Sequence, residues 1–223
     1  MIRAVISDFG GVLTTPLSAG FLAYLEEAGV MTPNPAHPAK PGASALEELG
    51  RAMHRATEVH GEHPLYALER GEISEAEFAR RLEEQLDAGF DLARLRHLYF
   101  DRIEPNPPMI RFLAELRGRG LRMALLTNNV REWEALWRAK LPELDEIFEL
   151  VVDSAFVGMR KPERRIYELT LERLGDGLRG EECLFVDDLE VNCEGARALG
   201  MKAVRFVDSE QAIAELESAL RAQ

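Results

Sequence analysis

Cysteines, basic residues and long apolar runs are all scarce in this chain. It has 2 cysteines in 223 residues, Cys183 and Cys193, so no disulfide framework is expected and both thiols are expected to be reduced and buried. No apolar run approaches the length of a membrane-spanning helix. The N-terminus has no basic stretch followed by a long apolar segment, so no signal peptide is predicted and the expected location is cytoplasmic.

The scarcity of positive charge limits the partners of the chain. Its 27 lysines and arginines face 39 aspartates and glutamates, which gives a formal net charge of −12. A nucleic-acid backbone requires a basic stripe, so no nucleic-acid partner is expected, and no membrane partner either. An acidic surface also repels phosphate esters, so any phosphate site has to supply positive charge locally.

Asp8 is the most informative residue that the chain does contain. It follows an apolar run at 2–6 and precedes Gly10 and Gly11. A run rich in valine and isoleucine that breaks at glycines is typical of a buried strand ending in a tight turn. The carboxylate is therefore expected at the exit of a strand, where open α/β sheets bind ligands, although an aspartate in a turn also serves as a hydrogen-bonding residue.

Three later segments place polar residues in comparable positions. An apolar run at 121–126 ends in a hydroxyl and two amides, Thr127, Asn128 and Asn129. A run at 183–186 ends in two adjacent carboxylates, Asp187 and Asp188. A basic turn between these runs carries Lys161 just before a proline. Each segment alone has a simpler explanation: helix capping for Thr127 to Asn129, solvation for Lys161 and the helix dipole for Asp187 and Asp188. These explanations account poorly for the four segments together.

Strands and helices alternate from residue 121 onward. We expect strands at 121–126, 148–152, 183–186 and 203–207, and helices at 166–174, 190–199 and 210–221. This alternation predicts a parallel sheet with right-handed crossovers.

Asn192, in the helix at 190–199, is placed to reach back and orient Asp188, or is simply a polar helix residue. Trp133 and Trp137 are four residues apart on a helix and are interpreted as core or interface packing.

The strand signal is absent between residues 15 and about 100. We expect helices at 21–28, 45–59 and 74–86, the last beginning with a capping box of Ser74 and Glu77, and a proline-rich loop at 32–42. Three histidines lie in this part of the chain, at His54, His60 and His63. A metal site is the less favoured interpretation, because Gly61 and Pro64 interrupt the helix that would carry the ligands.

Four motifs carry a resemblance to a known family. Asp8 in DFGGVL, Thr127 in LLTNN, Lys161 in GMRKP and the pair Asp187-Asp188 in FVDD resemble the motifs of the haloacid dehalogenase (HAD) superfamily. The stretches GMRKPERRIYELTLERLG and VDDLEVNCEGARALGM are similar to the branch that includes the phosphatase domain of bifunctional soluble epoxide hydrolases. The resemblance implies an α/β fold with a Rossmann-like parallel sheet core, residues 1–15 and 101–223, and an inserted helical cap domain, residues 16–100.

The resemblance also implies a phosphoric monoester hydrolase that acts on a small phosphate ester through an aspartyl-phosphate. Catalytic roles would fall on Asp8 as nucleophile, Thr127 and Lys161. Phosphate would be bound by Gly11, Asn128 and Lys161. Mg²⁺ would be bound by Asp8, the Gly10 carbonyl, Asp188 and, directly or through water, Asp187. Positioning and charge stabilisation would then carry most of the catalysis.

Gly10 departs from the family pattern. Most phosphatases of this family have a second aspartate at this position, which serves as general acid and base. Its loss is expected to cost on the order of 10²–10⁴-fold on poor leaving groups. A metal-free 2-haloacid dehalogenase and a non-enzymatic relative that binds a phosphorylated ligand stay as alternatives. The paired Asp187 and Asp188 argue against the first, and the intact motifs argue against the second.

We expect a monomer or a homodimer.

Overall fold

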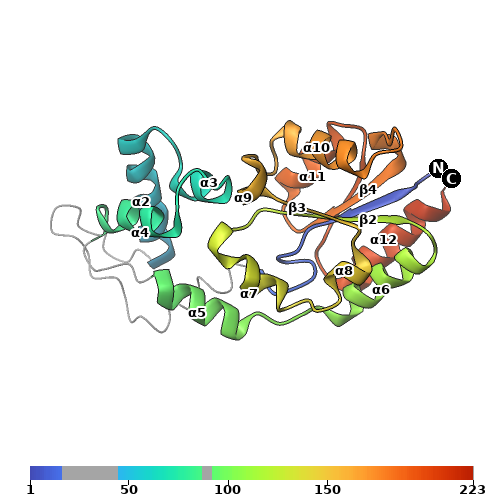
Figure 1. Cartoon of the computed structure of the whole chain (residues 1–223), viewed down its shortest axis with the longest axis horizontal. Coiled ribbons are helices and arrows are strands. Elements are labelled where there is room, and N and C mark those ends of the chain that lie inside the picture. Colours follow the sequence, from blue (N-terminus) through green and yellow to red (C-terminus); the bar gives the residue numbers. More distant parts are fainter. Residues whose placement is uncertain (17–44, 87–91, 223) are drawn as a thin grey trace.

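The computed structural model describes residues 1–16, 45–86 and 92–222 and contains a five-stranded parallel sheet (Figure 1). The strand order is β3-β2-β1-β4-β5. The strands are β1 (Ala4–Ser7), β2 (Arg122–Thr127), β3 (Leu150–Asp153), β4 (Cys183–Asp187) and β5 (Lys202–Arg205). The predicted α/β fold with a parallel sheet is confirmed. The predicted segments 21–28 and 32–42 lie outside the described residues.

Strand β1 occupies the centre of the sheet, where the chain order reverses. Ser7 is in register with Leu125 of β2 on one side and with Val186 of β4 on the other. The residues that follow in each strand therefore emerge side by side at the carboxyl edge of the sheet. Such a reversal point is where open α/β sheets bind their ligands.

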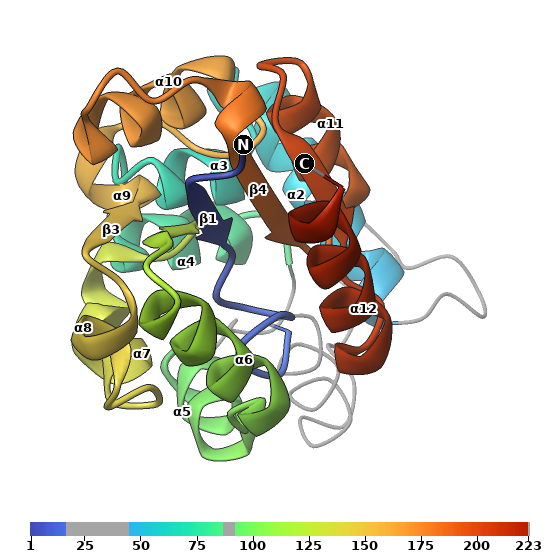
Figure 2. The ribbon, with the colours of Figure 1, turned by 90° about the vertical axis from the view of Figure 1, so that its right-hand side faces the viewer.

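Alternating side chains of the strands fill two hydrophobic clusters, one on each face of the sheet. Ala4 and Ile6 pack on the face covered by α10 (Arg164–Leu174) and α11 (Glu190–Arg197). Val5 packs on the face covered by α6 (Pro107–Gly118) and α12 (Ser209–Arg221). Figure 2 shows α10 above strand β1 and α6 below it. Burial on both faces explains why these strands are continuous apolar runs rather than alternating ones.

Four helices form what we call the helical region: α2 (Ala45–His60), α3 (Pro64–Glu69), α4 (Glu75–Glu83) and α5 (Leu92–Arg102). Figure 1 shows α2, α3 and α4 at the opposite end of the molecule from the two termini. Ser74 caps α4 by accepting a hydrogen bond from the Glu77 N–H at 3.2 Å. The Glu77 carboxylate pairs with Arg80 and Arg81, so only half of the expected capping box forms. None of the described helices is long and apolar enough to cross a membrane.

Helix α2 ends at His60 and α3 begins at Pro64, so Gly61 and Pro64 interrupt the helix as expected. Pro64 occupies the first turn of α3, where its missing N–H leaves no hydrogen bond unmade. The helix buries Ala67 and Leu68 and ends beside α9 (Ser154–Val157), a short helix that follows β3. The remaining elements are α7 (Glu134–Arg138), α8 (Leu144–Ile147) and 3₁₀ turns at Arg131–Trp133 and Gly180–Glu182.

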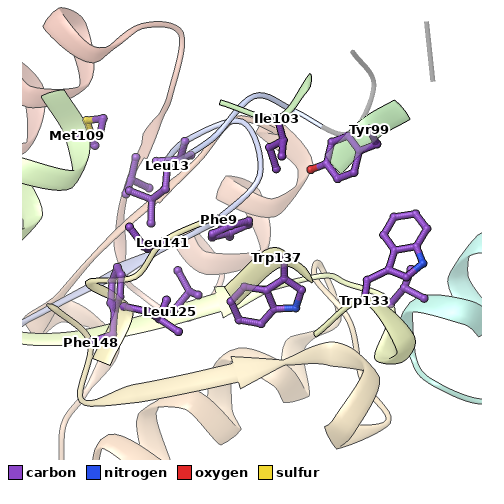
Figure 3. Packing of buried hydrophobic residues seen from close by; sticks show 14 of the residues in the cluster. Phe9, Leu13, Tyr99, Ile103, Met109, Leu125, Trp133, Trp137, Leu141 and Phe148 are labelled. Carbon is purple, nitrogen blue, oxygen red and sulfur yellow. The ribbon is translucent and has the colours of Figure 1, made fainter. Parts of the chain in front are cut away.

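An aromatic cluster joins the β1 turn to helices α5 and α7. The Phe9 and Trp137 ring centroids are 5.1 Å apart, and those of Tyr99 and Trp133 are 6.2 Å apart. Figure 3 shows Trp137 next to Phe9 and Trp133 below Tyr99. Both tryptophans are buried, so the expectation that they pack in the core is confirmed. The cluster ties the helical region to the sheet next to Asp8.

A buried carboxylate ends strand β3. Asp153 accepts a hydrogen bond from the Ala155 N–H at 3.0 Å and so caps α9. Its second oxygen, Oδ2, and the Trp137 indole N–H are buried without a hydrogen bond inside the described ranges. The Trp137 indole lowers the pKa of Asp153, although the two groups do not form a hydrogen bond. Burial dominates and raises the pKa of Asp153 to about 6.

Asp153→Asn should stabilise the protein at neutral pH while keeping the helix cap. Because folding raises this pKa from 3.8 to about 6, the ionised carboxylate destabilises the folded state. The destabilisation is absent at pH values below the pKa of the unfolded state and complete above the pKa of the folded state. Removing the charge should therefore add about 1–3 kcal/mol to the free energy of unfolding near pH 8 and little near pH 4. Urea unfolding across this range measures the difference. Asp208→Asn, at an exposed cap of α12, is the control, and a gain that does not change with pH would refute the explanation.

Candidate active site

Three carboxylates converge at the carboxyl edge of the sheet. Asp8 follows β1, Asp187 ends β4 and Asp188 comes directly after it. One oxygen from each lies within 4.8 Å of the others. Among the residues that the structure describes, this is the one place where three or more potential metal-ligating side chains meet. The parallel sheet therefore brings together the acidic residues that the sequence predicted to be neighbours.

Lys161 lies between two of these carboxylates. Its Nζ is 2.7 Å from Asp8 Oδ1 and 2.7 Å from Asp187 Oδ2, and the side chain is 1% exposed. Burial lowers the pKa of Lys161, but the charges of Asp187 and Asp8 outweigh that effect and raise it, so the ammonium stays charged. The alternative of a solvated loop lysine is wrong.

The acidic cluster retains an excess of negative charge. Burial raises the pKa of Asp8 well above its usual value; Lys161 opposes this shift, while Asp187 and Asp188 add to it. Burial, followed by the charge of Asp187, also raises the pKa of Asp188. Carboxylates in this situation are stabilised in the ionised form by a bound cation, and hard oxygen ligands fit Mg²⁺.

Gly11 makes the close approach of Asp188 possible. Its φ is +83°, and a Cβ added there would lie 2.3 Å from Asp188 Oδ2. Glycine is therefore required at this position both for the backbone conformation and for the space. Gly10 differs, because it is not among the residues with positive φ and an added Cβ would meet nothing within 4 Å.

Asn128 holds the backbone of Lys161. Its Oδ1 accepts a hydrogen bond from the Lys161 N–H at 2.8 Å, and its Nδ2 donates to the Lys161 carbonyl at 3.0 Å. An amide side chain can make this reciprocal pair because it offers one donor and one acceptor side by side. The sequence predicts Asn128 as a phosphate-binding residue and does not predict this contact. The second motif thereby positions the third.

Asp187 is held by three donors. Its Oδ2 accepts from Lys161, and its Oδ1 accepts from the Leu189 N–H and from Asn192 Nδ2, both at 2.9 Å. The expectation that Asn192 orients Asp188 is therefore wrong, because its amide reaches Asp187 instead. These contacts suit Asp187 to fixing the ammonium of Lys161. Direct ligation of a metal by Asp187 stays a prediction.

A small cavity of about 50 Å³ lies at this edge of the sheet. The sheet side contributes Gly10, Thr127 and Asn128, and α3 contributes Leu65 and Glu69. Aromatic rings complete the wall, from Phe9, Tyr99, Trp133 and Trp137. Asn128, predicted to bind phosphate, and Thr127, predicted to be catalytic, thus line the same space as Glu69 of the helical region.

The three histidines of the helical region do not form a metal site. His54 lies 3.7 Å from Glu58 with its side chain largely exposed, and His60 lies 3.6 Å from Glu84. His63 stacks on the Tyr66 ring, with centroids 4.3 Å apart. Burial, followed by the charge of Arg160, lowers the pKa of His63. Each of these three histidines therefore has a separate environment.

Comparison with known families agrees with this geometry. A family model for haloacid dehalogenase-like hydrolases matches residues 2–200. The chain belongs to this family. It is therefore an HAD-type hydrolase, and the fold and acidic motifs described above are consistent with that membership.

Two curated relatives of this HAD hydrolase are phosphatases or bifunctional enzymes by name. Bifunctional epoxide hydrolase 2 of Rattus norvegicus is 26% identical over 230 residues, which cover 97% of this chain and 38% of that protein. Phosphatase MT3486 of Mycobacterium tuberculosis (strain CDC 1551 / Oshkosh) is 35% identical over 125 residues, which cover 56% of each protein. The aligned regions thus span less than two thirds of each relative's length.

Solved structures share the fold at low sequence identity. An HAD-like hydrolase from Porphyromonas gingivalis gives a TM-score of 0.72 at 22% identity, with both chains fully covered. The HAD-family enzyme bt-2542 from Bacteroides thetaiotaomicron, in complex with magnesium and inorganic phosphate, gives a TM-score of 0.59 at 21% identity. The match covers 92% of this chain and 94% of that chain. L-2-haloacid dehalogenase from Xanthobacter autotrophicus gives a TM-score of 0.60 at 23% identity, and the match covers 98% of this chain and 83% of that chain. These similarities establish the fold alone.

The two glycines of the first HAD motif should respond differently to alanine. Gly11→Ala combines a positive φ with a clash against Asp188, so it should lower the free energy of unfolding by at least about 1 kcal/mol. Gly10→Ala meets no atom and should change stability by less than about 0.5 kcal/mol, or increase it slightly. Chemical denaturation of both variants makes the comparison. Equal effects would show that Asp188 does not lie against the turn as described.

Proposed function

We propose that this HAD hydrolase is a Mg²⁺-dependent phosphatase that cleaves small phosphate monoesters through an aspartyl-phosphate on Asp8. The observation that carries the proposal is the bridge from Lys161 to Asp8 and Asp187, with Asp188 in the same cluster. A phosphatase uses each part: a carboxylate nucleophile, a fixed cation beside it and oxygen ligands for a metal.

The contacts of Asp8 suit it to nucleophilic attack. The Phe9 N–H, at 2.7 Å, and Lys161 both contact Oδ1, so Oδ2 is assigned to the attack on phosphorus. Lys161 neutralises charge as the carboxylate and phosphate approach. The Thr127 hydroxyl and the Asn128 backbone hold phosphate oxygens. Asp8, Asp188 and the Gly10 carbonyl would bind Mg²⁺, which supplies charge neutralisation when present.

The helical region is proposed to be a cap over this site, with the core formed by residues 1–15 and 101–223 and the cap by 16–100. Support comes from its docking, since Ser154 Oγ donates to the Glu69 carbonyl at 2.6 Å and α3 lies beside α9. The cavity lined by α3 and the sheet edge is small, about 50 Å³. Movement of the cap is proposed to admit the ester.

A 2-haloacid dehalogenase is the second candidate, because such an enzyme also works without a carboxylate at the position of Gly10. The three converging carboxylates favour the phosphatase, since halide displacement has no use for a divalent cation. A relative named as a phosphatase supports the same choice. The cytoplasmic location, the absence of nucleic-acid and membrane partners, and a monomeric or homodimeric state stay predictions.

Activity should require a divalent cation and Asp8. Release of nitrophenolate from p-nitrophenyl phosphate should depend on Mg²⁺ and disappear in EDTA, because the carboxylates of Asp8 and Asp188 repel a phosphate dianion unless a cation neutralises them. Asp8→Asn should abolish turnover and retain the fold by circular dichroism. Full activity in EDTA, or chloride release from 2-chloropropionate without metal, would favour the dehalogenase.

The rate of bond cleavage should depend steeply on the leaving group, because Gly10 supplies no proton to the departing oxygen. kcat/KM should fall sharply from nitrophenyl to phenyl to alkyl phosphates, whose alcohols leave poorly as anions. Gly10→Asp should flatten this dependence. The position tolerates a side chain, since an added Cβ meets nothing within 4 Å, and Gly10→Asn is the uncharged control. A flat wild-type series, with chemistry limiting, would reveal a different proton donor.

A further inference from the structure

Hydrolysis through Asp8 needs a base as well as a nucleophile. After the ester oxygen departs, water must attack phosphorus, and the attacking water must lose a proton. The residue two positions after a nucleophilic aspartate would face this water, but here it is Gly10. The base has to come from another residue near the site, and the cavity beside Gly10 is the place to look for it.

Glu69 is the one acidic side chain among the residues that line the cavity. It lies at the C-terminal end of α3 and lines the same cavity as Gly10 and Thr127. Its carbonyl accepts from Ser154 Oγ at 2.6 Å, and its carboxylate Oε2 accepts from Arg160 Nε at 2.5 Å. The backbone and the side chain of Glu69 are therefore both anchored to the core.

The surroundings of Glu69 suit a base. Its side chain is 12% exposed, and burial raises the pKa of its carboxyl, while Arg160 is the strongest of the charges that oppose this rise. Burial makes the carboxylate a stronger base, and Arg160 favours the ionised form that can accept a proton. The pairing with Arg160 holds the carboxylate ready to accept a proton, so Glu69 is assigned to the second half of the reaction.

Other groups near the cavity cannot fill this role. The phenol of Tyr99 also lines the space, but burial, followed by the charge of Asp8, raises its pKa, so it stays protonated. His54 and His60 pair with Glu58 and Glu84 and do not line the cavity. His63 stacks on Tyr66 and is likewise not a lining residue.

We propose that Glu69 is the general base that activates water to hydrolyse the aspartyl-phosphate, an inference that rests on the proposed phosphatase function. The water oxygen forms a bond to phosphorus while the bond from phosphorus to the Asp8 oxygen breaks, and its electron pair returns to the Asp8 carboxylate. The water proton passes to the Glu69 oxygen that Arg160 does not bind, and then to solvent. In the family pattern one aspartate serves both proton transfers. Here Gly10 gives no proton to the departing ester oxygen, and the attacking water passes its proton to Glu69 of the helical region.

Rapid-quench kinetics with a nitrophenyl phosphate tests this assignment. Glu69→Gln should release one nitrophenolate per active site at nearly the wild-type rate and then turn over on the order of 10²–10⁴-fold more slowly. Its steady-state rate should become insensitive to the leaving group, because hydrolysis of the aspartyl-phosphate then limits turnover. Glu72→Gln, which removes a nearby glutamate paired with Arg70, is the matched control and should behave as wild type.

Chemical rescue distinguishes a base from a structural residue. In Glu69→Ala, added formate should restore part of the slow phase, because a small carboxylate can occupy the vacated space, whereas a lost anchor to Arg160 is not replaced in this way. The inference is overturned if Glu69→Gln matches wild type, if it slows the burst and the steady state equally, or if formate has no effect on a folded Glu69→Ala. Absence of turnover in the wild type itself would instead refute the phosphatase proposal.

Discussion

The buried ammonium of Lys161 is the interaction on which the site depends. A buried ion costs several kcal/mol unless it is paired, and here one ammonium, 1% exposed, contacts two carboxylates at 2.7 Å. It fixes the end of β1, the end of β4 and the turn that carries Lys161, and Asn128 secures that turn from β2. With Asp188 included, two negative charges remain uncompensated, which is the charge of a divalent cation.

The arrangement divides the chemistry between rigid and docked parts of the chain. The sheet edge holds the proposed nucleophile Asp8, its partner Lys161 and the residues proposed to bind phosphate, because parallel strands end at one edge. The helical region contributes Glu69 through contacts with Ser154 and Arg160. If Glu69 acts as proposed, hydrolysis of the aspartyl-phosphate depends on the docking of α3 against the core.

Much of this was accessible from the sequence, because the apolar runs mark strands and parallel strands bring their ends together. The convergence of Asp8, Asp187 and Asp188 follows from that rule. The burial of Lys161 does not, since lysine is usually solvated and its partners are distant in sequence. The partner of Asn192 was missed because Asp187 and Asp188, adjacent in sequence, present their carboxylates to different surroundings. The role of Glu69 depends on docking between helix α3 and the core, which no local pattern encodes.

The most direct test of the account is chemical trapping of the phosphorylated residue. Enzyme quenched during turnover of a phosphate monoester and reduced with borohydride converts an aspartyl-phosphate to homoserine, which peptide mass spectrometry locates. The account predicts homoserine at position 8, in amounts that increase when hydrolysis is slowed. Sustained turnover with Asp8 unmodified under these conditions, or with the modification at another residue, would contradict it.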